Sequence, residues 1–425
     1  MSHPKLRIVM LHDSQGRALV ILPHDNLLNL VSVWKHTHRQ LQPLSAHDSE
    51  TFFSQKALDT EKGIQQLLTL PVLMEPDCVS GDTFSVFEPN SGRTFALSSS
   101  KIEATVQSCK LALTTEMIDA KQPKGNDVVT ITSAVEKFTT LRIKQRLEDT
   151  LGLPTLPPTA QKIIELRADP NSNVDDLVPI VQMDPSLSAQ VMSWAASPYY
   201  AAPGGIDSIH DAIVRVLGYD LVVNLALGVA MGRTLKMPTD TPRGGTPYWV
   251  QALFCATLSE NLAKQMPKDK RPRPGLVYLT GLLHNFGYLT LAHIFPPHFS
   301  LVSRYIEANP HLHHEYVEKQ IINVTREQVG AWLMETWNLP GEVCTGIRYQ
   351  NSLSYHDDHQ AYANLIDLSL RVMRRNNLGD GPVGDIPQAL YQELGLEPDQ
   401  VQQIFLEIHD KSEQLDELTR FLKAS

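Results

Sequence analysis

The feature that most restricts the fold of this chain is a helical pattern of apolar residues from about residue 132 to residue 425. Residues typical of helix ends divide this pattern. Asp184-Pro185 offers a side-chain cap followed by proline in the first turn. Leu187, Val191 and Ala195 then fall on one face of the helix that follows. Because no strand pattern interrupts the region, we predict an all-α domain over residues 132–425, with a helical extension at its C-terminal end.

The first 118 residues have a mixed pattern instead. Strands are predicted at residues 7–11, 18–22, 70–74, 83–87 and 93–97, and helices near residues 26–37 and 49–54. The last two strands flank a turn sequence that ends in Gly92, which is typical of a hairpin. The polar stretch over residues 120–127 predicts a linker, which we place at residues 119–131. The predicted fold class is therefore multidomain, with a mixed α/β domain over residues 1–118 followed by the all-α domain.

Composition and charge exclude several classes of protein. Of the 425 residues, 42% are hydrophobic and 20% are charged, which excludes disorder throughout. The net charge of −10 argues against general nucleic-acid binding, which needs many Lys and Arg side chains. The four cysteines are widely spaced and predict buried reduced thiols. Since no apolar run is long enough for a signal peptide or a membrane span, we expect a cytoplasmic protein that does not bind membranes.

The helical region contains a series of short motifs in a fixed order. They are Leu153-Pro154-Thr155-Leu156-Pro157, Asp184-Pro185-Ser186-Leu187, Ala196-Ser197-Pro198-Tyr199-Tyr200, Ile206-Asp207-Ser208-Ile209-His210-Asp211-Ala212-Ile213, Leu217-Gly218, Gly281-Leu282-Leu283-His284-Asn285-Phe286-Gly287, Val329-Gly330-Ala331-Trp332-Leu333 and Trp337-Asn338-Leu339-Pro340. In this order they resemble the HDOD domain, the HD-related output domain of bacterial signalling proteins, over about residues 151–369. The resemblance implies a helical scaffold related to that of HD-type metal phosphohydrolases.

Enzymes of the HD type bind one or two metal ions through His and Asp side chains from different helices, and the metal activates water. At the corresponding positions this chain has Gln251, His284 followed by Asn285, Arg326, and Tyr349-Gln350. Asparagine is neutral and cannot anchor a divalent cation as a carboxylate does, and arginine would repel one. The resemblance therefore implies no catalytic residue, no metal and no other cofactor at these positions.

Other potential metal ligands lie outside this motif context. The segments His311-Leu312-His313-His314-Glu315 and His356-Asp357-Asp358-His359 lack the i, i+4 histidine spacing of a helix-borne site. Their surroundings are polar, and we expect solvated surface there. Asp367, on a late predicted helix, is out of register with the expected carboxylate ligand.

The N-terminal region carries a second set of motifs. They are the strand pair that ends in Leu22-Pro23-His24, the turn Leu41-Gln42-Pro43-Leu44-Ser45, the strand Leu70-Pro71-Val72-Leu73-Met74 and the hairpin with glycines at 81 and 92. Over about residues 5–115 they resemble the YbaK/ProX-type aminoacyl-tRNA deacylase domain. In that family a lysine near the first strand is important for activity, and the resemblance implies a groove near Lys5 or Arg7. Residues 75–81 replace the usual glycine-rich strand, so we expect a ligand- or partner-sensing remnant.

These features together predict a bacterial signal-transduction protein. Its HDOD scaffold would be catalytically degenerate, and it would act through contacts with other signalling proteins. Two enzymatic alternatives stay open. The first is a metal-dependent HD-type phosphohydrolase. The second is aminoacyl-tRNA deacylation by the N-terminal domain, and only under this alternative would tRNA be a partner.

Overall fold

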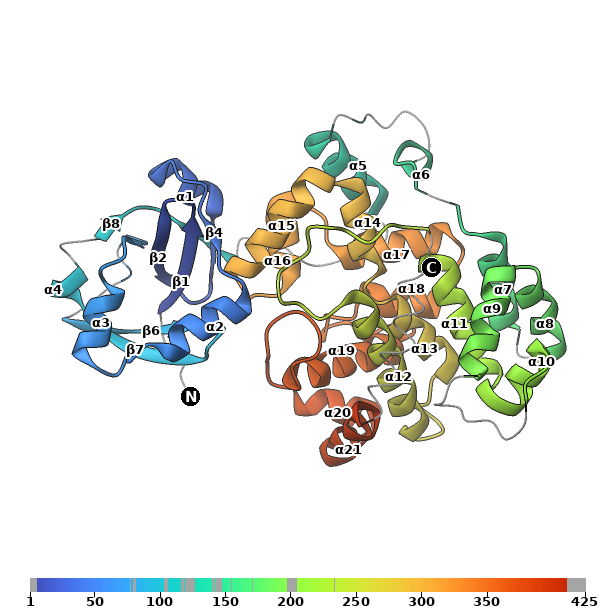
Figure 1. The fold of residues 1–425 in the computed structure, drawn as a ribbon. Coiled ribbons are helices and arrows are strands. Elements are labelled where there is room, and N and C mark those ends of the chain that lie inside the picture. Colours follow the sequence, from blue (N-terminus) through green and yellow to red (C-terminus); the bar gives the residue numbers. More distant parts are fainter. Residues whose placement is uncertain are drawn as a thin grey trace. The chain divides into compact units, whose positions relative to one another are not determined.

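The computed structural model describes the chain except for residues 1–5, 77, 79–81, 103–105, 116–117, 119–126, 140, 142–146, 154, 170, 197–204, 233 and 411–425. The chain forms two compact units, and neither unit is one continuous stretch of sequence (Figure 1). The first unit contains Met1–Ala120, Thr239–Gly245 and Pro297–Asn323. The second unit contains Lys121–Pro238, Thr246–Pro296 and Val324–Ser425. The first unit therefore combines the N-terminal α/β region with a loop and two helices from the helical region.

Strands and short helices alternate in the first unit. They are β1 (Leu6–Asp13), β2 (Gly16–Pro23), β3 (Asn26–Leu28), α1 (Leu30–Thr37), β4 (Gln42–Pro43), α2 (Ala46–Gln55), α3 (Glu61–Leu67), β5 (Val72–Met74), β6 (Thr83–Glu88), β7 (Arg93–Ser98), α4 (Ser99–Ile102), β8 (Val106–Ser108) and β9 (Ala112–Thr114), followed later in the chain by α15 (Pro296–Ala308) and α16 (His314–Ile322). In the described part of the chain, the main sheet has the order β7-β6-β1-β2-β5-β8, and β4 pairs with β1. The strands β3 and β9 form a separate two-stranded sheet.

The predicted strand pairs are confirmed. β1 and β2 run antiparallel, and β6 and β7 form the hairpin with Phe84 opposite Leu97. The helix predicted near residues 26–37 is shorter than expected, because residues 26–28 form β3 and pair with β9. The side chain of Asn29 then accepts hydrogen bonds from the backbone N–H groups of Val31 and Ser32, so the helix begins only at Leu30.

The two central strands of the main sheet, β1 and β2, are buried on both faces over most of their length, as the unbroken apolar run of β1 requires. One face carries Ile8, Met10, Leu19 and Ile21, which pack with apolar side chains of α2 and α3 in one core cluster. On the other face the alternate residue Arg7 reaches the corner between α15 and α16. A segment some 300 positions away in sequence therefore helps to cover the N-terminal sheet.

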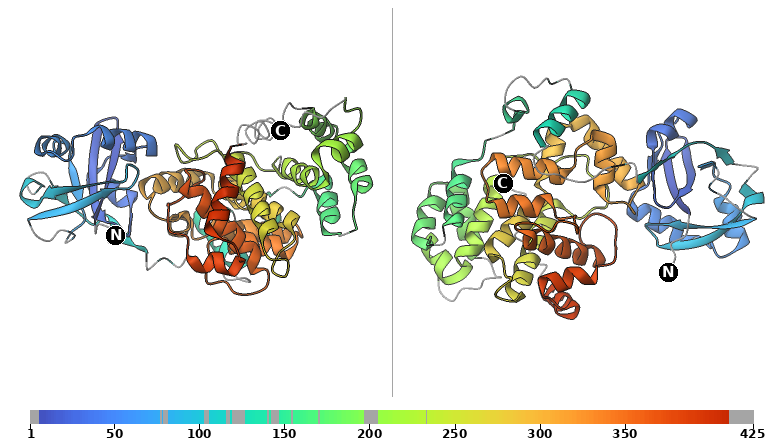
Figure 2. Two further views of the ribbon diagram at one scale, coloured as in Figure 1. Left: turned by 90° about the horizontal axis from the view of Figure 1, so that it is seen from below. Right: turned by 180° about the vertical axis from the view of Figure 1, so that it is seen from behind.

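The second unit is helical, as predicted. Its elements are α5 (Asp127–Phe138), α6 (Leu147–Thr150), α7 (Pro158–Ala168), α8 (Val174–Gln182), α9 (Pro185–Ala195), α10 (Ile209–Asp211), the π-helical segment η2 (Ala212–Leu217), α11 (Tyr219–Gly232), α12 (Tyr248–Gln265), α13 (Pro274–Leu283), α14 (Phe286–Ile294), α17 (Arg326–Thr336), α18 (Gly341–Arg348), α19 (Gln360–Arg375), α20 (Gln388–Leu394) and α21 (Pro398–His409). Figure 2 shows α7 to α11, in green, as a group of adjoining helices.

Local signals place several of these helices correctly. Asp184 caps α9 with its side chain, Pro185 is the first helical residue, and Leu187, Val191 and Ala195 are all buried. The helix α5 begins at Asp127, within the segment predicted as a linker, whereas residues 119–126 lie outside the described residues. No single helix among the described residues has both the length and the apolar character needed to cross a bilayer. One bent pair, Ile209–Leu217 with Tyr219–Ala230, passes on length and composition alone.

Candidate functional site

Four of the residues singled out by the HD resemblance meet in the interior of the second unit. His284 and Asn285 form the junction between α13 and α14, Arg326 is the first residue of α17, and Gln350 follows α18. All four are buried, with 2–7% of each residue exposed. The structure therefore brings these four positions together in one buried interior.

Two glycines allow α14 and α17 to pack closely against each other. A Cβ atom added to Gly287 would lie 1.8 Å from the backbone oxygen of Arg326, and one added to Gly330 would lie 3.2 Å from the Cα atom of Gly287. No side chain fits between α14 and α17 at this crossing. The pair of glycines thus fixes the distance between Asn285 and Arg326.

His284 is held in one orientation. Its Nδ1 atom lies 2.6 Å from the backbone oxygen of Gly281. Because a carbonyl oxygen can only accept, Nδ1 carries the hydrogen and Nε2 keeps its lone pair. Burial, together with the charges of Arg374 and Arg326, lowers the pKa of His284 to about 4, against the opposing effects of the Gly281 carbonyl and Glu327. The imidazole is therefore neutral at pH 7.

The neighbours of His284 bond to one another. Gln350 donates from Nε2 to the backbone oxygen of His284 over 2.9 Å. Arg326 donates from Nη1 to the Oδ1 atom of Asn285 over 3.3 Å, and its guanidinium lies 4.8 Å from the centre of the Tyr288 ring. An amide paired with a guanidinium therefore lies beside His284.

The other two positions make contacts of their own. Gln251 donates from Nε2 to the backbone oxygen of Thr246 and to Oδ2 of Asp380, over 2.8 and 2.9 Å. Tyr349 stacks on Tyr355, with ring centres 3.9 Å apart. Among the described residues, no recorded hydrogen bond joins Gln251 or Tyr349 to His284.

Sequence reasoning missed much of the charge in this interior. Arg374 on α19 is buried, donates from Nε to the backbone oxygen of Asp380, and has a pKa that burial lowers. Asp367 is also buried and accepts from Nε of Arg371 over 2.7 Å; burial raises the pKa of Asp367. The three α19 residues stand at i, i+4 and i+7, so they share one face of a buried helix. This spacing of charged residues was the sequence signal that could have identified them.

A second buried ion pair ties the start of α5 to α18. Arg348 donates to both carboxylate oxygens of Asp127, over 2.8 and 2.5 Å. Gln328 donates to the same carboxylate, and Glu335 accepts from Arg348. The raised pKa of Arg348, which burial opposes and Asp127 favours, keeps the guanidinium charged. The pair is structural, and nothing in the sequence pattern pointed to it.

Of the two N-terminal candidate residues, Lys5 and Arg7, the structure describes only Arg7, which is not seen to line a groove. Arg7 is fully buried, and its two Nη atoms donate to the backbone oxygens of Ala308 and Asn26 and to Oδ1 of Asn309. Burial lowers the pKa of Arg7 to about 9. Its terminal nitrogens are thus used inside the first unit and do not line an open groove. Lys5 lies outside the described residues.

Comparison with known proteins agrees with the helical architecture. The model of the HDOD domain matches residues 153–353. A crystal structure of a candidate signal transduction protein from Marinobacter aquaeolei VT8 is 38% identical, with a TM-score of 0.89, and the alignment covers 98% of this chain and 93% of that one.

More distant matches share the fold. An HDOD domain protein of unknown function from Geobacter sulfurreducens is 22% identical, with a TM-score of 0.54, over 69% of this chain and 99% of that one. A candidate phosphohydrolase from Shewanella amazonensis SB2B is 19% identical, with a TM-score of 0.52, over 68% and 98%.

An uncharacterised protein of Treponema pallidum (strain Nichols) is 24% identical over 259 residues, which are 61% of this chain. The chain spans about half the length of that curated relative, 48% of it. None of these comparisons identifies the N-terminal region as a deacylase domain. Residues 153–353 are an HDOD domain. The chain belongs to the same family as the Marinobacter protein.

Proposed function

We propose that this chain is a signal-transduction protein whose HDOD domain is a catalytically degenerate scaffold that acts by binding other signalling proteins. The observation that carries the proposal is the Arg326–Asn285 pair beside His284. It places a buried positive charge at the centre where related enzymes would hold a divalent cation.

The donor set around His284 does not fit a catalytic metal. Asn285 and Gln350 are neutral amides, and both are engaged in hydrogen bonds within the group. Burial is the largest cause of the lowered pKa of His284; the charges of Arg326 and Arg374 also lower it, because they disfavour a second positive charge there, whereas Glu327 raises it. A divalent cation at Nε2 would experience the same repulsion. We therefore assign no hydrolytic step to this centre.

The test measures metal content and hydrolysis in the full chain. The protein is incubated with Mn²⁺, Fe²⁺ or Zn²⁺, desalted and submitted to elemental analysis, and is assayed with a phosphomonoester and a cyclic dinucleotide. We expect no stoichiometric metal that depends on His284 and no hydrolysis. The matched variants are His284→Ala and His356→Ala, since His356 is exposed. Stoichiometric metal or hydrolysis lost in His284→Ala but kept in His356→Ala would establish a phosphohydrolase instead.

The Marinobacter relative supports the signalling part of the proposal, because it is similar over nearly its whole length and is itself a candidate signal transduction protein. The N-terminal region would then supply sensing. The burial of Arg7 gives no support to the deacylase alternative. Release of amino acid from mischarged tRNA, abolished by Lys5→Ala, would be the result that favours it.

A further inference from the structure

The first unit contains a cavity of about 330 Å³ that none of the sequence motifs explains. It lies between α1, the segment that leads from α1 into β4, and α15. Its apolar wall includes Val31, Trp34 and Leu301, and two arginines, Arg39 and Arg304, also line it. The cavity is open to solvent, and its volume lies at the lower end of the range of sites for small organic molecules.

Part of the apolar wall is exposed to solvent. Trp34 is 50% exposed and Val31 is 41% exposed, whereas Leu30 and Val33 of the same helix are buried. The helix α1 therefore packs one face into the unit and presents an aromatic ring on the other. A half-exposed indole in a hollow leaves a large apolar surface in water, and a planar ring stacked on it would remove that surface.

Arg39 supplies the polar end of the cavity. Its Nε and Nη2 atoms donate to the two carboxylate oxygens of Asp13 over 2.9 and 2.5 Å, and Nη2 also donates to the backbone oxygen of Gly16. Among the described residues, no acceptor meets its Nη1 atom. The guanidinium is thus held rigidly and keeps donor capacity for one acceptor group.

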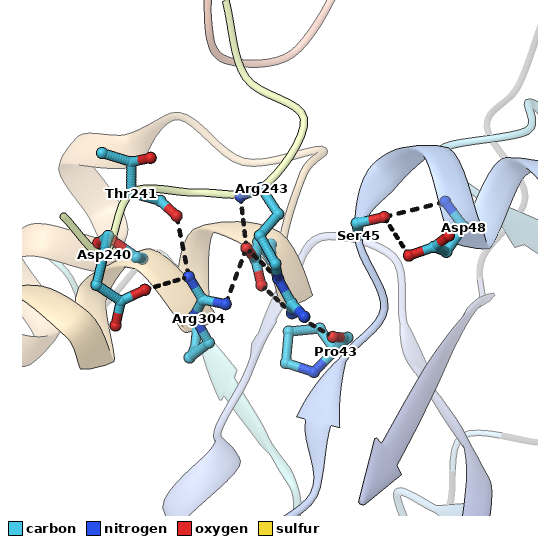
Figure 3. Close-up of polar contacts among 9 residues, drawn as sticks. Pro43, Ser45, Asp48, Asp240, Thr241, Arg243 and Arg304 are labelled. Atoms are coloured by element: carbon cyan, nitrogen blue, oxygen red, sulfur yellow. Dashed lines mark hydrogen bonds and ion pairs between the residues drawn. The ribbon is translucent and has the colours of Figure 1, made fainter.

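Arg304, the second arginine of the cavity, is held by its own set of acceptors. It donates to Oδ1 of Asp240 and to the backbone oxygen of Thr241, over 2.9 and 3.0 Å, and lies 3.2 Å from Glu307. Figure 3 shows Arg304 directed toward Asp240 and Thr241, with Arg243 beside it. Both cavity arginines are paired with carboxylates, so the cavity does not carry the excess charge that a polyanion would need.

We propose that this cavity binds a small planar aromatic carboxylate, with its ring against Trp34 and Val31 and its carboxylate facing Arg39. The ring fits the exposed apolar wall, and a single anionic group fits a single fixed guanidinium. Such a ligand would be an input for the proposed signalling function. Its binding is measured directly, so the two proposals can fail separately.

The test titrates the full chain with benzoate and 2-naphthoate by calorimetry. The ligand controls are 2-naphthamide, which lacks the charge, and cyclohexanecarboxylate, which lacks the planar ring. We expect saturable binding of 2-naphthoate with one site per chain. Each ligand control should bind about tenfold more weakly or worse, which corresponds to about 1.4 kcal/mol.

Variants locate the site. Trp34→Ala removes an exposed side chain, so the fold is retained, and we expect at least about tenfold weaker binding of 2-naphthoate. Leu406→Ala, at a side chain that is 49% exposed in the second unit, is the matched control and should bind as the wild type does. The proposal is wrong if neither aromatic carboxylate binds, if cyclohexanecarboxylate binds equally well, or if Trp34→Ala leaves the affinity unchanged.

Discussion

At the scale of single residues, the centre of the HDOD domain is a group of buried polar side chains around His284. His284 has one defined orientation, with Nδ1 bonded to a carbonyl and Nε2 available as an acceptor. Beside it, Arg326 donates to the Oδ1 atom of Asn285. The guanidinium of Arg326 therefore contributes positive charge to this interior.

Burial of His284 predicts a specific dependence of stability on pH. The pKa of this imidazole is about 4 in the folded chain, below its ordinary value of 6.5. The unfolded chain therefore binds the proton first, and the unfolding free energy falls as the pH drops from 6.5 toward 4. By pH 5 this single group should cost about 2 kcal/mol. Urea unfolding of wild type and His284→Gln at pH 7 and pH 5 measures the difference. Equal losses in the two proteins would contradict the prediction.

The individual residues at this centre could be named from the sequence only in part. The motif around residues 281–287 identified His284 and Asn285, because they sit in a recognisable order of residues. Asp367 falls out of register in the sequence with the expected carboxylate ligand, and Arg374 is not singled out there, since an arginine on a late helix more often faces solvent. Only the packing of α19 into the interior shows that these charges are buried.

At the scale of elements, close contact between α14 and α17 depends on glycine. Gly287→Ala would place a methyl group 1.8 Å from the backbone oxygen of Arg326. We expect a loss of about 3 kcal/mol of unfolding free energy, more than the gain in helix propensity. Gly384→Ala is the control, because an added Cβ meets nothing within 4 Å there. Chemical denaturation of both variants measures the change in unfolding free energy. An unchanged value for Gly287→Ala would show that α14 and α17 can move apart at little cost.

The attachment of α5 depends on the buried pair of Asp127 and Arg348. Arg348→Met leaves the carboxylate buried without its guanidinium and should cost about 3–5 kcal/mol. The double variant Asp127→Leu/Arg348→Met removes both charges and should recover part of that loss. Hydrogen exchange of the α5 amides should increase more in the single variant. If the double variant is the less stable of the two, the pair contributes more than charge compensation.

Element ends were predictable wherever one residue carries the signal. Asp184 and Pro185 begin α9 as expected, because the cap and the proline act within one turn. The helix expected near residues 26–37 was too long, because pairing of residues 26–28 with β9 is set by residues far along the chain. The π-helical geometry of η2 has no local signal in our sequence reasoning.

At the scale of the whole molecule, the first unit is closed by residues that the sequence pattern assigned to the helical region. Asn309 accepts at Oδ1 from Arg7 and from the backbone N–H of Leu28, over 2.6 and 2.7 Å. Arg243 bonds both Glu307 and the backbone oxygen of Pro43. Contacts between residues some 200–300 positions apart do not affect the local hydrophobic pattern of the sequence. This part of the architecture could therefore not be predicted from it.

These contacts predict that residues 1–118 are not stable as a separate fragment. Expressed alone, the fragment leaves Arg7 without its acceptors in the α15–α16 corner and exposes part of the β1–β2 face. We expect the β1 and β2 amides to exchange at least about tenfold faster in the fragment than in the full chain. Asn309→Ala in the full chain should produce a smaller change in the same direction. Equal protection in fragment and full chain would show that the N-terminal module folds independently.

The interrupted path of the chain has a consequence for synthesis. The first unit takes its last segment from Pro297–Asn323, after most of the second unit's N-terminal helices have already been made. A nascent chain that has produced its N-terminal sheet must therefore keep one face of it uncovered until residue 323 leaves the ribosome. During that interval the exposed apolar face of the sheet is a surface at which we expect the newborn protein to aggregate or to need a chaperone.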